Sequence, residues 1–101
     1  MDEYHYHRGL IFVWGHDKAV SNIADHDGIT FQYAADAFFD PFLVYLDTSR
    51  NDEQREAIIG RAGHSLLFVV NIENDSSGHI RIISARYARP NEKRYYESRN
   101  T

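Results

Sequence analysis

The sequence lacks cysteine altogether, so it has no disulfide framework, no thiolate nucleophile and no thiolate ligand for a metal. It also lacks a long hydrophobic run. The longest, Leu66–Val70, is far too short to span a bilayer, and no charged-then-apolar leader opens the chain. The lack of cysteine fits a reducing compartment. We expect a soluble, cytoplasmic protein with no membrane segment.

Several catalytic motifs are absent as well. Gly60 and Gly63 lack the spacing, and the following Lys-Ser/Thr, of a phosphate-binding loop, and no serine stands in a G-x-S-x-G setting. The histidines form no H-E-x-x-H motif. His5 and His7 could place two imidazoles on one side of a strand, but two ligands at a chain terminus do not make a metal site. We therefore expect neither a metal nor a cofactor.

The composition is that of one globular domain. A chain of 101 residues with 43% hydrophobic and 14% aromatic side chains can bury a core and lies outside the disordered range. We expect a single domain over residues 1–101. Its opening, MDEYHYHRG, is polar and histidine-rich, which predicts a loosely ordered terminus over residues 1–9.

The spacing of apolar residues changes along the chain. Phe31, Ala34, Ala35 and Phe38 recur at helical spacing after Thr30, a suitable N-cap, whereas the later apolar runs are typical of strands. The expected helices are 17–24, 31–38 and a terminal helix from residue 90, and the expected strands are 10–14, 43–46, 55–61, 66–72 and 79–86. This order predicts an α+β fold, an antiparallel four- to five-stranded sheet with two N-terminal helices and a C-terminal helix.

Basic residues are few, and they are unevenly placed. Eleven Lys and Arg stand against fifteen Asp and Glu, for a formal net charge of −4. Residues 1–54 carry ten acidic and three basic side chains, and residues 55–101 carry five acidic and eight basic ones. Six of the basic residues and three of the seven tyrosines fall within Arg81–Arg99. Such a segment binds phosphate, nucleic acid or a carboxylate-rich partner, or it is a solvated face of salt bridges.

The positions of three residues in this segment predict a site that could bind a phosphate. Alternation along the expected strand places Arg86 at its end, on the same face as Ile82 and opposite to Arg81. In the following helix Glu92 and Tyr96 stand at i and i+4. A cation, a carboxylate and a phenol would converge, a set suited to binding a phosphate and moving protons. The same residues also suit a structural ion pair at a helix start, with a packed tyrosine.

A histidine elsewhere is a second candidate. His26 follows the first expected helix and precedes the turn at Asp27-Gly28. As a general base or acid it could take part in chemistry near pH 7. A loop histidine that hydrogen-bonds backbone groups is the other interpretation.

These residues fall within a pattern that resembles the BrnT-type toxins of bacterial type II toxin–antitoxin systems. The resemblance covers about residues 12–96. It begins in FVWGHDKAVSNIADHDGITF, which is similar to the family's W-D-x-x-K-x-x-x-N-x-x-K-H segment and the phenylalanine after it through Trp14, Lys18, Asn22, His26 and Phe31. It continues in REAIIGRA, LLFVV and RIISARYA, and it ends in a helix that carries Glu92, Tyr95 and Tyr96. Each piece alone is weak, but their ordered co-occurrence is specific.

The resemblance implies a RelE-like fold, a ribonuclease that cleaves RNA and halts translation, and a BrnA-type antitoxin that binds the toxin and carries any DNA contact. We expect a metal-independent endoribonuclease in which the substrate's own 2′-hydroxyl attacks the phosphate. The site residues expected on this basis are Glu92 or His26 as the base, Tyr96 as a proton donor, Arg55, Arg81 and Arg86 as a cationic clamp, and Arg89, Lys93 and Arg94 as further RNA contacts.

The Arg81–Arg99 segment is expected to serve twice, binding RNA phosphates in the free toxin and lying under the antitoxin in the complex. A non-catalytic RNA- or protein-binding module is the other interpretation of the whole chain. It would have lost its activity through Gly15-His16 and Asp25, which depart from the family's N-terminal segment.

Overall fold

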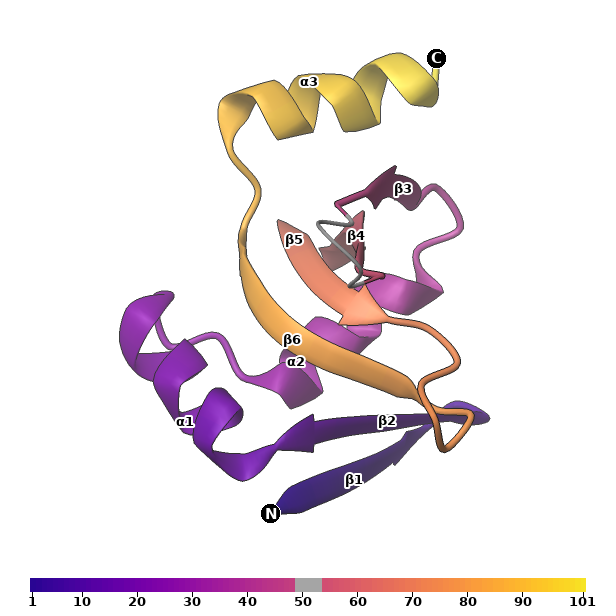
Figure 1. Cartoon of the computed structure of the whole chain (residues 1–101). Helices are drawn as coiled ribbons and strands as arrows, with labels where there is room; N and C mark the ends of the chain where they lie inside the picture. Colours follow the sequence, from indigo (N-terminus) through magenta and orange to yellow (C-terminus); the bar gives the residue numbers. More distant parts are fainter. Residues whose placement is uncertain (49–53) are drawn as a thin grey trace.

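The structure, a computed structural model, describes residues 1–48 and 54–101 and is built on one six-stranded sheet in the order β1-β2-β6-β5-β4-β3 (Figure 1). The strands are β1 (Asp2–His7), β2 (Leu10–Gly15), β3 (Val44–Asp47), β4 (Glu56–Ala62), β5 (Ser65–Ile72) and β6 (Ile80–Tyr87). The helices are α1 (His16–Asp25), α2 (Phe31–Ala35), the 3-10 helix η1 (Asp36–Phe39) and α3 (Pro90–Arg99). The predicted α+β fold is confirmed. Within these residues no helix is long and apolar enough to cross a membrane.

The sheet differs from the predicted one in its size and its strand directions. It has six strands, and β2 runs parallel to β6 while the other neighbours are antiparallel. The prediction of a purely antiparallel sheet of four to five strands is wrong in these respects. The parallel pair joins Phe12 to Ile80 and Val13 to Arg81, residues far apart in the chain. Local periodicity cannot reveal such a pairing.

Residues 2–7 form a strand where the sequence predicted a loosely ordered terminus. β1 pairs with β2 along its full length, from Asp2 opposite Gly15 to His7 opposite Leu10. Glu3 and His5 stand two residues apart and therefore share one side of the strand. This side packs on Trp14: the indole N–H donates to Glu3 at 3.0 Å, and the ring centroids of His5 and Trp14 lie 5.8 Å apart.

The helices lie where the sequence predicted them, except that the second one ends early. Thr30 is the N-cap of α2, and its hydroxyl oxygen accepts from the backbone N–H of Tyr33 at 3.0 Å. The expected helix 31–38 ends at Ala35 and continues as η1. This segment lies directly on β4: a Cβ added to Gly60 would stand 2.4 Å from the carbonyl oxygen of Ala37. Only glycine permits so close an approach between the two backbones.

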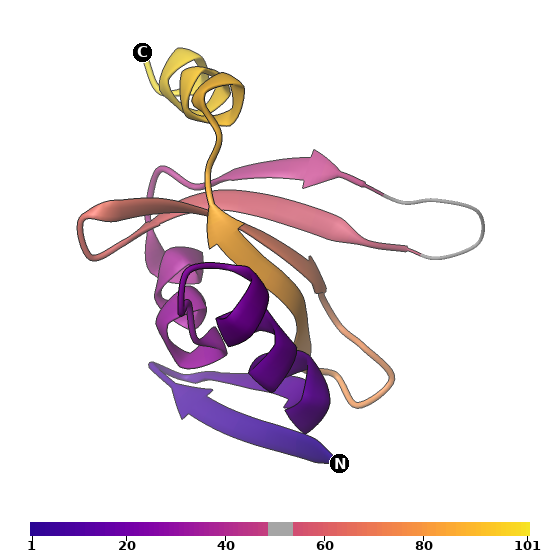
Figure 2. The ribbon, with the colours of Figure 1, turned by 90° about the vertical axis from the view of Figure 1, so that its left-hand side faces the viewer.

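The helices cover both faces of the sheet. α1 and α2 lie on one side of strands β3 to β5, and α3 lies on the other (Figure 2). The main core is on the first side and includes Phe12, Trp14, Phe31, Ile58, Leu67, Val69 and Ile82. A smaller cluster of Ile59, Ala88 and Tyr96 lies under α3. Tyr96 is the buried residue of α3, and partly buried Val44, Leu46, Leu66 and Phe68 pack against this cluster.

A bulge in β6 decides where Arg86 points. The register between β5 and β6 shifts between Val70 and Asn71. As a result Ile82 and Ala85, three residues apart, both pack in the main core. Arg86 instead points toward the α3 side of the sheet, so the prediction that it shares a face with Ile82 is wrong. The extra residue changes the alternation on which that prediction rested.

Candidate functional site

Arg86 and Glu92 form the pair that the sequence predicted. The Nη1 and Nη2 atoms of Arg86 donate to the two carboxylate oxygens of Glu92, each at 2.8 Å. The guanidinium lies 4.2 Å from the centroid of the Phe68 ring. The exposed fractions of the two side chains are only 20% and 12%. The pair thus joins the end of β6 to the first turn of α3.

The surroundings of Glu92 limit its chemistry. Burial alone would raise the pKa of this carboxyl group, but hydrogen bonds from Arg86 and from the backbone N–H of Arg89 outweigh burial and lower the pKa. Glu92 also caps α3, because its Oε1 accepts that N–H at 2.8 Å. A carboxylate that binds protons weakly and has both oxygens hydrogen-bonded is a poor general base. This geometry favours the structural interpretation of the pair.

Tyr96 bonds to Asp40 instead of turning to Arg86 and Glu92. Its hydroxyl donates to Asp40 Oδ2 at 2.7 Å, and only 7% of the residue is exposed. Asp40 is itself buried and accepts two further hydrogen bonds, from the backbone N–H of Phe42 and of Arg61, both at 2.8 Å. Burial, together with the bond to Asp40, raises the pKa of Tyr96. The phenol therefore anchors α3 to the segment after η1.

The expected clamp of three arginines is not assembled. Arg81 donates to both carboxylate oxygens of Asp2, at 3.2 and 2.7 Å, and to Asp75 at 3.3 Å. It lies five residues before Arg86 on β6, roughly 16 Å away along an extended strand. Arg55 directly precedes β4 and lies at the same end of the sheet as Arg81. Neither shares a site with Arg86.

His26 lies apart from the other predicted site residues. It follows the last residue of α1 and lines a cavity of about 150 Å³. The other residues around that cavity are Lys18, Ser21, Asn22, Asp25, Ile83 and Ser84. Arg55, Arg81, Arg86, Glu92 and Tyr96 are not among them. The carboxylate of Asp25 makes this small cavity less suited to an anion than a purely cationic one would be.

Asn22 has a structural role that the sequence did not reveal. Its buried side chain donates to the carbonyl oxygens of Ile29 at 3.0 Å and Ala85 at 2.9 Å, and it accepts from the backbone N–H of Ala85 at 2.9 Å. β2 pairs with β6 near Ile80, and Ala85 lies further along the same edge. The side chain of Asn22 thus bonds the backbone of β6 at Ala85 as a neighbouring strand would. Its own buried amide is also fully hydrogen-bonded, as buried polar groups usually are.

A cationic cavity lies between the β4–β5 turn and the start of α3. It measures about 250 Å³ and is lined by Arg61, His64, Ser65, Leu66, Tyr87 and Lys93; we call it the hairpin cavity. None of these described residues is acidic, although the chain as a whole is. Arg61, His64, Tyr87 and Lys93 are exposed. Two cations, an imidazole and a phenol in one cavity suit an anion such as a phosphate.

The turn that carries His64 is firmly held. Ala62 pairs with Ser65, so Gly63 and His64 form a two-residue hairpin turn, and Gly63 has φ 58° as such a turn requires. The hydroxyl of Tyr33 donates to the carbonyl of Ala62 at 2.6 Å. Asp40 holds the backbone of Arg61 from the other side. A site on so fixed a turn is preorganised for binding.

The hairpin cavity contains one residue that the sequence predicted, Lys93, and three that it missed, Arg61, His64 and Tyr87. Arg89 and Arg94 are exposed on and beside the first turns of α3 and do not line the cavity. One feature of the sequence indicated where His64 lies. It follows Gly63 between two expected strands, and Arg61 stands three residues before it. A two-residue turn predicts a hairpin but not a function.

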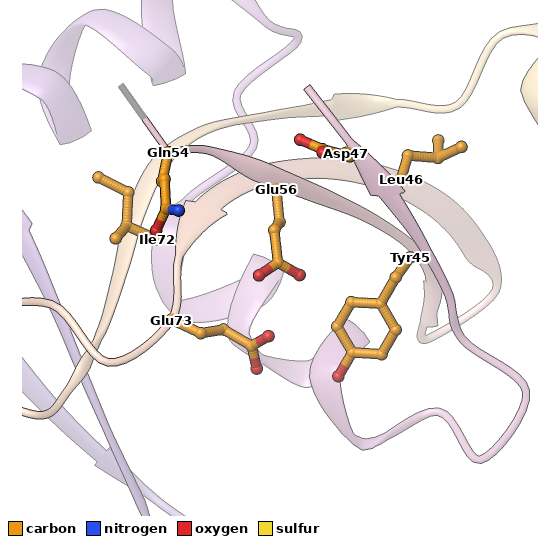
Figure 3. Close-up of a pocket in the computed structure, with 7 residues that line it drawn as sticks. All are labelled: Tyr45, Leu46, Asp47, Gln54, Glu56, Ile72 and Glu73. Atoms are coloured by element: carbon orange, nitrogen blue, oxygen red, sulfur yellow. The ribbon is translucent and has the colours of Figure 1, made fainter. Parts of the chain in front are cut away.

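A different cavity has the opposite charge. It measures about 320 Å³, and Glu56 and Glu73 point into the same space as the ring of Tyr45 (Figure 3). Burial, and then the charge of Glu56, raise the pKa of Glu73. Asp47 also lines this cavity. Such a site repels phosphate. Among residues 1–48 and 54–101, no group of three or more His, Asp or Glu side chains is arranged to hold a metal ion.

Comparison with known proteins supports the resemblance seen in the sequence. The family model described as "Ribonuclease toxin, BrnT, of type II toxin-antitoxin system" matches residues 14–92. The match runs from the end of β2 to the first turn of α3 and includes the β4–β5 turn. No curated protein matches the chain. Because the match covers most of the sequence, the chain belongs to the BrnT family of ribonuclease toxins of type II toxin–antitoxin systems.

Proposed function

We propose that this chain is an endoribonuclease that cleaves single-stranded RNA in the hairpin cavity. The observation that carries the proposal is the gathering of Arg61, His64, Tyr87 and Lys93, without an acidic lining residue, on a protein of net charge −4. Two cations offset the charge of one RNA phosphate, and an exposed tyrosine offers a surface for a base. The family supplies RNA cleavage as the reaction class.

The reaction we propose is an internal transfer of the phosphate. The 2′-oxygen attacks the adjacent phosphorus, a new O2′–P bond forms, and the bond from phosphorus to the 5′-oxygen breaks. The products are a 2′,3′-cyclic phosphate and a 5′-hydroxyl. His64 takes the proton of the 2′-hydroxyl and returns it to the leaving 5′-oxygen, so the protons balance. Arg61 and Lys93 hold the charge that builds on the phosphorus oxygens, and one such donor is worth about 3 kcal/mol.

In this proposal the predicted pair of Arg86 and Glu92 supports the site instead of reacting. It fixes the start of α3, and the next residue, Lys93, reaches the hairpin cavity. The bond from Tyr96 to Asp40 fixes the next turn of the same helix. Arg89 and Arg94 remain exposed cations that can contact RNA on either side of the cleaved phosphate.

Cleavage is expected to proceed without a metal, because none of the roles above requires one. Purified protein should cleave a labelled RNA in the presence of EDTA and leave ends that carry a cyclic phosphate. Heat-denatured protein from the same preparation is the control for contaminating nucleases. If EDTA abolishes cleavage and only a divalent metal restores it, the proposed mechanism is wrong.

A non-catalytic RNA-binding module is a second candidate function. It is favoured by one observation: Glu92 and Tyr96, two of the predicted catalytic groups, are held in structural contacts. Expression in a bacterium separates the two candidates. Growth arrest that is lost when Arg61 and Lys93 are both changed to alanine supports the enzyme. RNA binding without growth arrest supports the module.

The family also implies an antitoxin, and we propose that it silences the toxin in the cytoplasm by covering the hairpin cavity. Exposed arginine and tyrosine side chains dominate the energetics of many protein interfaces, and Tyr87, Arg89 and Arg94 supply them beside the cavity. In a complex with the protein from the adjacent reading frame, amides of Arg81–Arg99 should exchange hydrogen more slowly than in the free toxin. Protection confined to residues 1–40 would contradict masking. A BrnA-type identity for this partner, with DNA contact through the partner alone, stays a prediction.

A further inference from the structure

A second cavity adjoins the hairpin cavity. It measures about 410 Å³, and Arg61 lines both. The β1–β2 turn, the end of η1 and the β4–β5 turn meet around it. Its lining residues are His7, Arg8, Asp36, Phe39, Asp40, Pro41, Arg61 and Gly63. A ligand bound in one cavity and extending past Arg61 would enter the other.

One wall of this second cavity combines a cation with an aromatic ring. The guanidinium carbon of Arg8 lies 4.8 Å from the centroid of the Phe39 ring. Arg8 is exposed, in a tight turn where it has φ 50° and Gly9 has φ 88°. The ring of Phe39 is half-buried and packs edge-on against His7 and Phe12. The pair therefore offers a guanidinium and an aromatic ring, the two kinds of group on which nucleobases stack.

The acidic residues of the second cavity are already engaged. Asp36 Oδ1 accepts a hydrogen bond from Nε2 of His7 at 2.5 Å, and Asp40 accepts hydrogen bonds from Tyr96 and two backbone N–H groups. Their charges still offset those of Arg8 and Arg61, so this cavity has no excess of positive charge. It is less suited to a phosphate than the hairpin cavity, and better suited to a neutral base.

We infer that the second cavity is a nucleobase subsite, in which a base of single-stranded RNA stacks on Arg8 and Phe39 while a neighbouring phosphate occupies the hairpin cavity. The inference rests on the proposed function for the identity of the ligand. The β1–β2 turn lies outside residues 14–92, the part of the chain that the family model matches. Arg8 would thus be contributed by the N-terminal hairpin, outside the matched residues, whereas Phe39 lies within them.

The test uses an oligoribonucleotide of about eight nucleotides, a length in the range that binding grooves cover, with 2′-O-methyl groups that prevent cleavage. Its affinity is measured by fluorescence anisotropy for the wild type and three variants. Arg8→Ala is expected to weaken binding about tenfold, as loss of one stacked base does. Arg8→Lys should weaken binding nearly as much, because lysine keeps the charge but lacks the planar group. Lys18→Ala, which removes an exposed cation of α1 in a different cavity, is the control and should have little effect.

A second oligonucleotide with one abasic position, moved along the chain, identifies the stacked base. At one position the abasic site should weaken binding to the wild type but not to Arg8→Ala, because that variant has already lost the contact. Equal effects of Arg8→Ala and Lys18→Ala would overturn the subsite even if RNA is cleaved. Arg8-dependent binding without cleavage would keep the subsite and reject the proposed reaction. Failure of the wild type to bind the oligonucleotide would reject both.

Discussion

Replacement of His64 by alanine is expected to lower the rate of RNA cleavage by at least about 10²-fold, the usual contribution of a general acid–base group. Among the residues that line the hairpin cavity, His64 carries the side chain that most often serves as a general acid or base. Because His64 is exposed on a turn held by Tyr33 and Asp40, its loss should leave the fold intact. Single-turnover cleavage of a labelled RNA measures the rate.

Two comparisons make this result specific. Affinity of His64→Ala for an uncleavable RNA should stay within a few fold of the wild type, since Arg61 and Lys93 remain to hold the phosphate. The change His26→Ala, in the cavity beside α1, should lower cleavage far less. The opposite ranking of the two histidines would move the chemistry to the α1 cavity and contradict the proposed site.

The second large effect is expected on stability, from Asn22→Ala. This change removes three hydrogen bonds and leaves the backbone N–H and carbonyl of Ala85 buried without their partner. A buried polar group left unsatisfied costs roughly 1–3 kcal/mol, so we expect the free energy of unfolding to fall by about 3 kcal/mol. That is a large share of the roughly 5–15 kcal/mol typical of a small domain. Urea denaturation followed by circular dichroism measures it.

Ser21→Ala is the matched control for this prediction. Ser21 precedes Asn22 on α1 and is exposed, so its loss should change the free energy of unfolding by less than about 0.5 kcal/mol. An Asn22→Ala variant as stable as Ser21→Ala would mean that the hydrogen bonds to Ala85 contribute little.

The parts of the fold that local patterns determine could be predicted. Thr30 as a cap, the start of α3 at Pro90 and strands β4 to β6 followed from spacing and turn residues. The parallel pairing of β2 with β6 depends on contacts between distant segments, for which one sequence has no signal. β1 instead pairs with its neighbour β2 across Arg8 and Gly9, and it was missed because its polar, histidine-rich composition indicated a loose terminus. The face of Arg86 was missed because one extra residue in β6 reverses the alternation. The RelE-like character of the fold stays a prediction.

The candidate site was predictable only where its residues are close in sequence. Arg86 and Glu92 are six residues apart, at the end of a strand and the start of a helix, and they meet as expected. Tyr96 and Asp40 are separated by 56 residues, so the bond that engages the phenol could not be foreseen. His64 belongs to no motif, and it became a candidate only when folding brought Tyr87 and Lys93 next to its turn.

The most direct test of the central claim, that RNA binds in the hairpin cavity, is a map of backbone amide chemical shifts. An uncleavable RNA is titrated into the isotope-labelled protein, and the shifts are followed residue by residue. The largest changes are expected at Arg61–Leu66 and Tyr87–Lys93, with small changes around Glu56 and Glu73 in the acidic cavity. Changes centred on Lys18 and His26, with none at the β4–β5 turn, would contradict the claim.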